Sequence, residues 1–432
     1  MFLNGRAICS TILISFQEEF IHRILLFEDR CLDGYYLKHS YDVAVVGAGP
    51  AGSSVSKVVA KQGFSTIVFD RRSVIGHPVQ CGELIPTPSE ARNLFPRSSR
   101  MPSAVKVPVE FVTNRTDSIR LVSPNGSTYE FPFEANIVDR SRFDQYIAQE
   151  AVYAGAEMHL SIAAISRSAN NELITKGGAS TNSISASVVV GADGANSIVA
   201  RSLGEKYVHS KDDLSPSLQY VMSGLNVDES VVEMYFGDQI APGGYSWVIP
   251  KGNGLVNVGF GMRRNIAKDD TPLRTYLDRF VFKTLTSSSK AAKIERRIGA
   301  IIPVGGPLEK TWHDNTLLVG DAAGHVMASN GGGIPTALCG GEIAGDAIGS
   351  YLTNETPLST YEDEWRSEFG TELDTALRVL RIADNIMPSD FMTDLCMKLA
   401  GVRFLEPLIR CRLPLPVDLA SKTMVKVLSQ FI

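Results

Sequence analysis

The chain has 432 residues, of which 42 are Lys or Arg and 47 are Asp or Glu, so that its formal net charge is −5. This balance excludes the general basic field by which proteins bind nucleic acid, and we expect no nucleic-acid partner. A chain of this length predicts a large core built as two closely joined domains, and because no apolar run reaches about 18 residues we expect no transmembrane segment.

Residues 1–40 are interpreted as an N-terminal extension. Residues 8–16 resemble the apolar core of a secretory signal, but two glutamates follow in place of a small-residue cleavage site. The extension is therefore read as an amphipathic helix or as the product of an upstream start codon, with a targeting role as the alternative. The six cysteines of the chain show neither metal-type pairing nor the density of a disulfide scaffold, so we expect no metal site and a reducing, cytoplasmic compartment.

A βαβ unit begins at residue 41. Residues 41–46 are rich in valine, which is typical of a parallel strand buried on both faces, and the motif Gly47-Ala-Gly49-Pro-Ala-Gly52 follows directly. Residues 53–62 predict a helix, and residues 66–69 predict a second strand that ends at Asp70. Strand, glycine turn, helix, strand and acid together indicate a dinucleotide-binding unit.

Each member of this motif has a separate task in such a unit. Gly47 permits the tight turn, Gly49 lets the backbone approach a pyrophosphate, and Gly52 lets the helix pack on the strand. The helix N-terminus then faces the anion. Asp70 is placed to accept hydrogen bonds from the ribose hydroxyls of the adenosine.

Short β-rich runs at 105–112, 118–122 and 128–131, and again over most of 219–261, predict an antiparallel layer. Between these runs, residues 187–190 predict a strand that leads into a second motif, Gly191-Ala-Asp193-Gly194. A third motif, Gly320-Asp321-Ala-Ala, follows another apolar strand. Asp321 suits the ribityl hydroxyls of FAD, and because NAD has no ribityl chain this motif favours FAD as the cofactor.

Three glycines, Gly331, Gly332 and Gly333, open a further predicted helix that has Pro335 in its first turn. Such an N-terminus can stabilise negative charge on a reduced flavin. A flexible loop is the alternative interpretation of these glycines.

The last third of the chain predicts packed helices, because Trp365, Phe369, Leu373, Leu377 and Leu380 recur at intervals of three and four. Residues 402–426 alternate apolar side chains with bases and contain few acids. We expect this segment either to contact an anionic lipid surface or to be a packed helix with a solvated face. The bases in question are Arg403, Arg410, Arg412, Lys422 and Lys426.

The expected fold is therefore α/β with α+β elements: a Rossmann-type FAD-binding domain is interwoven with an antiparallel-sheet substrate domain, and C-terminal helices follow. The FAD-binding domain is assigned to residues 41–105, 135–200 and 300–350. The substrate domain is assigned to residues 106–134 and 201–299, and the C-terminal helical region to residues 351–432.

The chain resembles the geranylgeranyl reductase family of flavoproteins, within the larger p-hydroxybenzoate hydroxylase-like fold. The resemblance covers residues 41 to at least 380. Beside the three motifs, it is carried by Gln80-Cys81-Gly82-Glu83, by Val138-Asp139-Arg140 with Phe143-Asp144, and by Ala241-Pro-Gly-Gly244-Tyr245-Ser-Trp247-Val-Ile-Pro-Lys251-Gly252. It implies FAD contacts from Asp70, Cys81, Gly82, Arg140, Ala164, Asp193, Asp321, Gly332 and Gly333, in addition to Gly47, Gly49 and Gly52.

The family also implies roles for residues around the substrate. Gly244, Tyr245 and Trp247 are expected to contact a polyprenyl chain, and Tyr245 and Trp247 lie two apart and hence on one face of a strand. Cys81 is expected to be catalytic, with a proton donor near it. On the residues alone, the two aromatic rings could instead fill a sheet core, and Cys81 could be a small buried side chain.

The activity implied by the resemblance is the saturation of C=C bonds in geranylgeranyl chains of archaeal-type ether phospholipids, by hydride transfer from reduced FAD. An external electron donor, NAD(P)H or ferredoxin, is implied, as is a cytoplasmic location or a peripheral one on the inner face of the cell membrane. The chain has Met327-Ala-Ser-Asn330 where the family commonly has an Asp-Pro pair. The alternatives are a flavin monooxygenase of the same fold and a catalytically lapsed FAD-binding protein.

Overall fold

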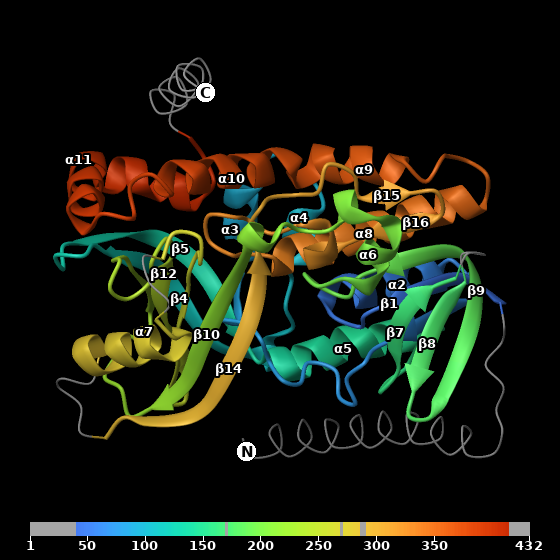
Figure 1. The fold of residues 1–432 in the computed structure, drawn as a ribbon, viewed down its shortest axis with the longest axis horizontal. Helices are drawn as coiled ribbons and strands as arrows, with labels where there is room; N and C mark the ends of the chain where they lie inside the picture. The colour runs from blue at the N-terminus through green and yellow to red at the C-terminus, as the bar shows by residue number, and fades with distance from the viewer. Residues whose placement is uncertain (1–39, 169–171, 268–270, 286–290, 414–432) are drawn as a thin grey trace, which may run out of the picture.

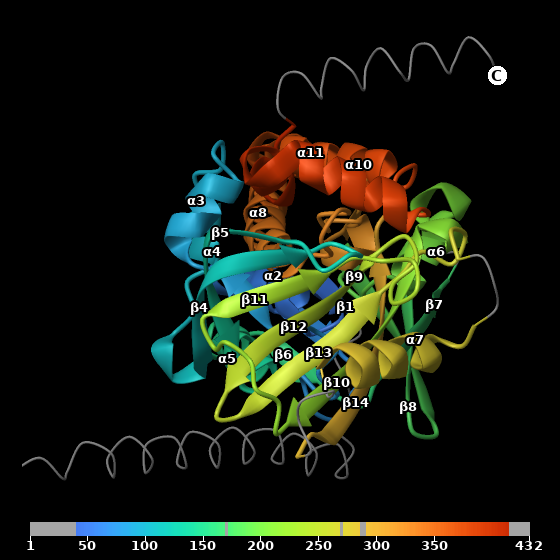
Figure 2. The same cartoon turned by 90° about the vertical axis from the view of Figure 1, so that its left-hand side faces the viewer.

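The computed structural model describes residues 40–168, 172–267, 271–285 and 291–413 (Figure 1). Two sheets lie side by side, with helices packed around the first and a layer of C-terminal helices across both (Figures 1 and 2). One buried apolar cluster continues from the first sheet into the second, including Val45, Val55, Ile343, Ile119 and Ile137. The arrangement confirms the predicted mixture of α/β and α+β elements. The predicted N-terminal extension lies outside the described residues, apart from Ser40.

The first sheet contains the predicted βαβ unit. Its strand order is β15-β16-β9-β1-β2-β6, parallel from β16 to β6 with β15 antiparallel at the edge. A further hairpin, β7 and β8, pairs with the first part of β9. The strands are β1 (Ser40–Val46), β2 (Thr66–Phe69), β6 (Glu157–His159), β7 (Ala163–Arg167), β8 (Leu173–Gly177), β9 (Ser180–Gly191), β15 (Trp312–His313) and β16 (Thr316–Leu318).

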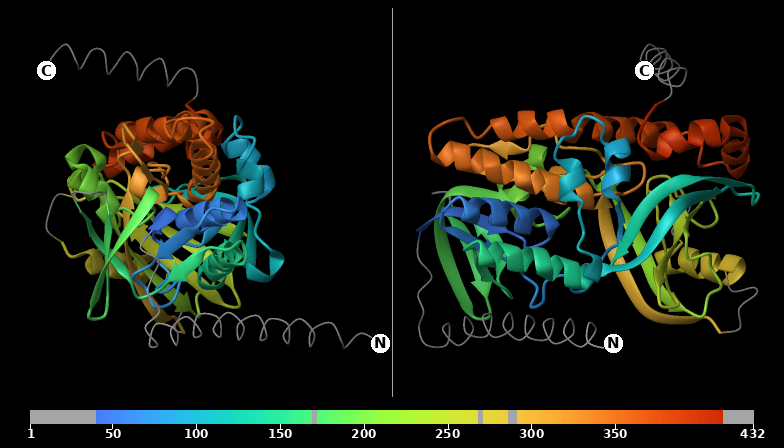
Figure 3. Two further views of the ribbon diagram at one scale, coloured as in Figure 1. Left: turned by 90° about the vertical axis from the view of Figure 1, so that its right-hand side faces the viewer. Right: turned by 180° about the vertical axis from the view of Figure 1, so that it is seen from behind.

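Helices cover this sheet. The helix α2 (Pro50–Lys61) packs between α8 (Ile334–Leu352) and α5 (Arg140–Tyr153), and the view from behind shows the three lying one above another (Figure 3). The short α6 (Ile198–Leu203) follows β9. Because β1, β9 and β16 are adjacent and parallel, their carboxyl ends bring the three glycine-acid motifs to one edge of the sheet.

The second sheet has the order β14-β10-β13-β12-β11-β4-β5-β3. Its strands are β3 (Leu84–Pro86), β4 (Val112–Val122), β5 (Thr128–Val138), β10 (Leu214–Ser223), β11 (Val231–Tyr235), β12 (Tyr245–Gly252), β13 (Leu255–Gly261) and β14 (Lys293–Pro303). Every pair is antiparallel except β4 with β11, which is parallel. The helix α7 (Leu273–Phe280) packs on β10, and a π-helical turn at Val281–Leu285 follows it.

The strand prediction over 105–112 was wrong. Val105 ends the short helix α4 (Met101–Ala104), and Val109–Phe111 form a 3-10 turn, so the strand begins only at Val112. It then runs without a break through the segment for which a separate strand was expected. Proline at 108 cannot donate to a ladder, which explains the late start.

The C-terminal layer contains α9 (Thr360–Trp365), a π-helical turn (Arg366–Gly370), α10 (Thr371–Ala383) and α11 (Asp390–Ile409), and α3 (Pro88–Leu94) lies beside it (Figure 2). The predicted helical spacing is confirmed, because Trp365, Phe369 and Leu373 are fully buried. Gly401 interrupts α11 with a φ of 57°. Within the described ranges, no helix has the length and apolarity needed to cross a membrane.

One of the bases that the sequence placed in a surface segment is buried. Arg410 is 8% exposed, and its Nε lies 2.7 Å from Glu90 Oε1. Its guanidinium also contacts the carbonyl oxygen of Pro132 and lies over the ring of Phe133. Arg410 therefore anchors the end of α11 to the body of the protein and is not available to a lipid surface. Residues 414–426 of the same predicted segment lie outside the described residues.

Candidate active site

The turn between β1 and α2 uses its three glycines in two different ways. A Cβ at Gly47, whose φ is +99°, would lie 2.3 Å from the Ala192 carbonyl oxygen, and a Cβ at Gly52 would lie 1.8 Å from that of Gly47. The protein's own packing therefore requires both glycines. Gly49 differs, because its φ is −74° and a Cβ there would meet no protein atom within 4 Å. A glycine at 49 is explained by a ligand that approaches the N-terminus of α2.

Asp70 stands directly beside this turn, at the end of β2. Its Oδ2 accepts a hydrogen bond from the backbone N of Ala48 at 2.9 Å, and its Oδ1 accepts one from the backbone N of Arg72 at 2.8 Å. Asp70 thus fixes the glycine turn. Each carboxylate oxygen can accept a further bond, so the predicted ribose contact is compatible with this arrangement and stays a prediction.

Asp193 and Ala164 have structural surroundings of their own. The Asp193 carboxylate accepts hydrogen bonds from Ser197 Oγ at 2.5 Å and from the backbone N of Ile198 at 2.6 Å, which ties it to the start of α6. Ala164 lies in β7 and belongs to the buried cluster of the first sheet. Their predicted FAD contacts remain predictions, and for Ala164 the backbone is the part able to make one.

Asp321 lies beside the first turn of α8. A Cβ on Gly333, the residue before that helix, would come within 3.3 Å of Asp321 Oδ1. Burial raises the pKa of Asp321 from 3.8 to about 6, although the charge of Arg140 acts to lower it. Among the described residues, the Asp321 carboxylate has no hydrogen-bond or ion-pair partner. A ligand hydroxyl would supply the missing donor.

Cys81 is joined to the predicted substrate residues through Gln219. Gln219 Nε2 donates to the Cys81 carbonyl oxygen at 3.0 Å, and Trp247 Nε1 donates to Gln219 Oε1 at 2.9 Å. The Cys81 thiol accepts a hydrogen bond from the backbone N of Glu83 at 3.1 Å. Burial raises the pKa of this thiol, against the opposing charge of Arg140. The structure thus connects the predicted catalytic residue to Trp247. The pair of rings expected to contact the substrate, Tyr245 and Trp247, is called the aromatic wall below.

A buried charged network lies behind Cys81 and Gly82. Glu83 Oε2 accepts hydrogen bonds from Lys251 Nζ and, at 2.8 Å, from Asn257 Nδ2. Asn257 Nδ2 also donates to the Gly82 carbonyl oxygen at 3.1 Å. Lys251 belongs to β12 and Asn257 to β13, so the network ties the Cys81 segment to the second sheet.

Arg140 begins α5 and lies near Cys81. Its Nε and Nη2 lie 2.7 and 2.8 Å from the two carboxylate oxygens of Asp144. Burial alone would lower the pKa of Arg140, but Asp144 and Cys81 raise it above its usual value. Arg140 is therefore a fixed positive charge that acts on both Cys81 and Asp321.

Tyr245 and Trp247 stand together at the start of β12. Their ring centroids are 5.9 Å apart in an edge-on arrangement, and the Trp247 ring occupies the space that a Cβ on Gly259 would fill. The Tyr245 hydroxyl donates to the Asn330 carbonyl oxygen at 2.5 Å. A Cβ on Gly244 would lie 2.0 Å from the Gly261 carbonyl oxygen, so Gly244 is required by the packing of the chain. Substrate contact by these three residues stays a prediction.

The loop that departs from the family pattern is held by its own side chains. Asn330 Oδ1 accepts a hydrogen bond from the backbone N of Gly332 at 2.9 Å. Asn330 Nδ2 reaches the Ile409 carbonyl oxygen at 3.4 Å, and Ser329 Oγ lies 3.6 Å from Cys411 Sγ. Asn330 therefore shapes the triple-glycine turn and links it to the end of α11.

Gln219 and Asn257 were missing from the predicted site residues, and Glu83 and Lys251 appeared only as parts of motifs. All four are buried. The sequence does contain a signal that could have found them. Each is a polar or charged side chain inside a buried strand or segment, and such groups need specific partners.

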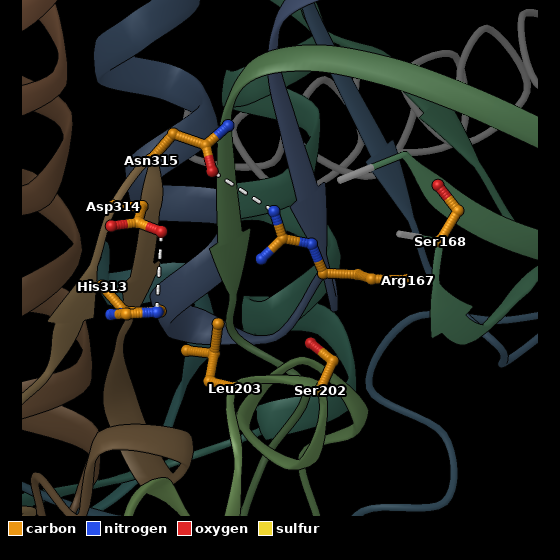
Figure 4. Close-up of a pocket in the computed structure, with 7 residues that line it drawn as sticks. All are labelled: Arg167, Ser168, Ser202, Leu203, His313, Asp314 and Asn315. Carbon is orange, nitrogen blue, oxygen red and sulfur yellow. Dashed lines mark hydrogen bonds and ion pairs between the residues drawn. The ribbon is translucent and has the colours of Figure 1, made fainter. Parts of the chain in front are cut away.

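A separate pocket of about 150 Å³ lies at the edge of the first sheet (Figure 4). Arg167 Nη2 and Asn315 Oδ1 lie 3.2 Å apart in it, and His313 is 3.6 Å from Asp314. None of the predicted site residues lines this pocket, which is formed by Arg167, Ser168, Ser202, Leu203, His313, Asp314 and Asn315.

Comparison with known proteins identifies the family. Two models match the chain: the geranylgeranyl reductase catalytic domain over residues 213–301, and an NAD(P)-binding Rossmann-like domain over residues 45–87. The digeranylgeranylglycerophospholipid reductase 2 of Methanothermobacter thermautotrophicus is 35% identical over 80% of this chain and 88% of the relative. The chain belongs to the geranylgeranyl reductase family. A relative from Methanocaldococcus jannaschii, digeranylgeranylglycerophospholipid reductase, is 34% identical over 81% of this chain and 88% of its own.

Solved structures agree with this membership. A geranylgeranyl bacteriochlorophyll reductase-like protein from Thermoplasma acidophilum matches with a TM-score of 0.75 and 26% identity, over 91% of this chain and all of that one. The flavin-dependent brominase Bmp2 matches with a TM-score of 0.64 at 17% identity, which shows a shared fold alone. The predicted family and FAD as cofactor are thus confirmed. The space without protein atoms beside Gly49, and the Asp321 carboxylate that no described residue bonds, both fit FAD.

Proposed function

We propose that this geranylgeranyl reductase family member saturates C=C bonds in geranylgeranyl chains, and that its substrates are archaeal-type ether phospholipids. The names of its relatives support the lipid class. The observation that carries the proposal is the hydrogen-bonded connection from Cys81 through Gln219 to Trp247, because it places a thiol and an aromatic wall in one assembly. An aromatic wall suits an apolar polyprenyl chain.

The isolated alkene has no carbonyl group to polarise it, so proton delivery has to accompany the reduction. When bound in its reduced form, FAD would supply a hydride to one alkene carbon. The Cys81 sulfur accepts a hydrogen bond from the Glu83 backbone, and its S–H proton is assigned to the other carbon. Because burial raises the pKa of the thiol, Cys81 keeps this proton at neutral pH.

Tyr245 and Trp247 are assigned to orient the polyprenyl chain so that one face of the alkene meets the reacting groups. The Tyr245 hydroxyl is already bonded to the Asn330 carbonyl oxygen, which favours a packing role for this ring over proton donation. Burial raises the pKa of this hydroxyl well above its usual range. Tyr245 therefore stays neutral.

The remaining expectations extend this function. The first sheet with α2, α5 and α8 serves as the FAD-binding domain, and the second sheet as the substrate domain. An external donor, NAD(P)H or ferredoxin, reloads the flavin. The enzyme works in the cytoplasm, at the inner face of the membrane.

An anaerobic reoxidation experiment tests the function. The FAD enzyme is photoreduced without oxygen and mixed with a geranylgeranyl ether phospholipid. We expect the flavin to be reoxidised by the lipid alone, with gain of two hydrogens per bond. Reoxidation that needs oxygen and adds an oxygen atom to the lipid would establish the monooxygenase alternative, and a protein that retains no flavin would establish the lapsed one.

A further inference from the structure

The helix α11 exposes a row of large apolar side chains. Phe391 is 72% exposed and Leu399 is 76% exposed, and three further apolar side chains of α11 are also exposed. The complete set, called the α11 face below, is Phe391, Met392, Leu395 and Leu399, with Val402 directly after the break at Gly401. A single exposed leucine is ordinary, whereas a contiguous apolar set on one helix marks an interaction surface.

Helix geometry places these residues together. Phe391, Leu395 and Leu399 follow each other at intervals of four, and residues so spaced lie on one side of a helix. The opposite side of α11 carries Thr393 and Met397, which are buried against the protein. The helix thus packs through one narrow side and presents its larger apolar side outward. It lies in the outer layer of the molecule (Figures 1 and 2).

The acidic and the basic side chains of α11 have different surroundings. Two acids bond to the protein body: Asp390 Oδ1 accepts from the backbone N of Asp238 at 2.7 Å, and Asp394 Oδ1 accepts from that of Asn125 at 3.0 Å. Lys398 and Arg403 are exposed, and within the described residues neither has a hydrogen-bond or ion-pair partner. The exposed side therefore combines apolar groups with uncompensated positive charge, which complements an anionic lipid surface.

Both ends of α11 contact the loops of the candidate site. At its start, the Asp390 carboxylate accepts a hydrogen bond from the backbone N of Asp238. Asp238 belongs to the segment that leads into Tyr245. At its end, the Ile409 carbonyl oxygen accepts from Asn330 Nδ2, and Cys411 Sγ lies 3.7 Å from Met327 Sδ. A surface bound to this helix would consequently lie next to the two loops that flank the aromatic wall.

We propose that the α11 face docks the enzyme on an anionic lipid bilayer, with its apolar side chains inserted at the level of the headgroups and with Lys398 and Arg403 against lipid phosphates. This inference rests on the proposed function, since a lipid substrate has to be withdrawn from a bilayer. It moves the membrane contact from residues 402–426 to a face centred on 391–402.

Vesicle sedimentation tests the docking. The full-length FAD-loaded protein is spun with vesicles of phosphatidylcholine, with or without phosphatidylglycerol, and compared with a variant carrying Phe391→Ser, Leu395→Ser and Leu399→Ser. Binding to the anionic vesicles should fall at least about tenfold in the variant. Lys398→Glu with Arg403→Glu should abolish the preference for phosphatidylglycerol. As a matched control, Val109→Ser with Phe282→Ser removes apolar groups that are 69% and 60% exposed elsewhere, and should bind like the parent.

Turnover separates this inference from the function itself. The triple-serine variant should reduce detergent-dispersed lipid at the parental rate and lose activity only on lipid embedded in vesicles. Unchanged vesicle binding by that variant overturns the docking face. A parental dimer that dissociates on the triple substitution also overturns it, and makes the α11 face a contact between two copies. Vesicle binding by a parent that saturates no lipid refutes the proposed function and leaves the docking face intact.

Discussion

Lys251 Nζ donates a hydrogen bond to Glu83 Oε2 in the protein interior, where the two side chains are 9% and 1% exposed. The pair connects β12 of the second sheet to the residue two positions after Cys81. Glu83 has a φ of 69°, a conformation that non-glycine residues seldom adopt. The hydrogen bonds from Lys251 and Asn257 to its carboxylate therefore also stabilise this backbone conformation. The position of Cys81 therefore depends on a charged contact with the second sheet, outside the three glycine-acid motifs.

Removal of one member of this pair should be more harmful than removal of both. Lys251→Met leaves the Glu83 carboxylate buried without its cation and should lower the free energy of unfolding by about 3–5 kcal/mol. The double variant Glu83→Gln with Lys251→Met should recover a large part of that loss. Urea unfolding of the apoproteins measures both, and equal losses in the single and double variants would show that the pair is not coupled.

Gly49→Ala and Gly52→Ala should separate cofactor binding from folding. A Cβ at 49 meets no protein atom, so the variant should fold normally and bind FAD more weakly by at least about tenfold, because the methyl group fills the space for the pyrophosphate. A Cβ at 52 would strike the Gly47 carbonyl oxygen, so that variant should be destabilised whether or not FAD is present. FAD titration and thermal unfolding test this, and undiminished FAD affinity in Gly49→Ala would contradict the placement of the pyrophosphate.

Asp321→Asn should stabilise the apoprotein at neutral pH while it weakens FAD binding. The pKa of Asp321 is raised to about 6 in the folded chain, so the protonated carboxyl favours folding below pH 3.8, and this contribution is lost as pH rises through about 6. At pH 7 the ionised group therefore costs stability, and the asparagine should add about 1–2 kcal/mol to the unfolding free energy of the apoprotein, allowing for solvent screening.

The pH dependence supplies the control for Asp321. Near pH 4 the carboxyl is already protonated in the folded protein, so the stabilisation by asparagine should disappear there. A gain in stability that is equal at both pH values would mean that the ionisation of Asp321 is not its cause.

The Cys81 thiol should react slowly with iodoacetamide at mildly alkaline pH. Only the thiolate is nucleophilic, and burial raises the pKa of this thiol above 9.0, so its alkylation should increase at higher pH than that of a small free thiol. Peptide mass spectrometry of the labelled FAD enzyme follows the residue, with Cys81→Ser as the blank. Rapid labelling at neutral pH would indicate a thiolate and exclude the thiol as the proton source.

The local motifs predicted the FAD half of the fold well, because each glycine and acid acts on neighbours close in sequence. The strand, turn and helix around Gly47 and the helical spacing from Trp365 to Leu373 are examples of this. The link from Cys81 through Gln219 to Trp247 joins three segments far apart in the chain, and no periodicity encodes such a pairing. The burial of Arg410 by Glu90, 320 residues away, was hidden for the same reason.

The central claim is that this chain, with reduced FAD, adds hydrogen to an isolated C=C bond with the help of Cys81. Mass spectrometry of lipids from cells that make geranylgeranyl ether phospholipids tests it most directly, with the chain expressed as the parent or as Cys81→Ala. The parent should shift the lipids upward by two hydrogens for each bond reduced, and Cys81→Ala should retain FAD but give no such shift. Lipids of unchanged mass with the FAD-loaded parent, or equal saturation by Cys81→Ala, would contradict the claim.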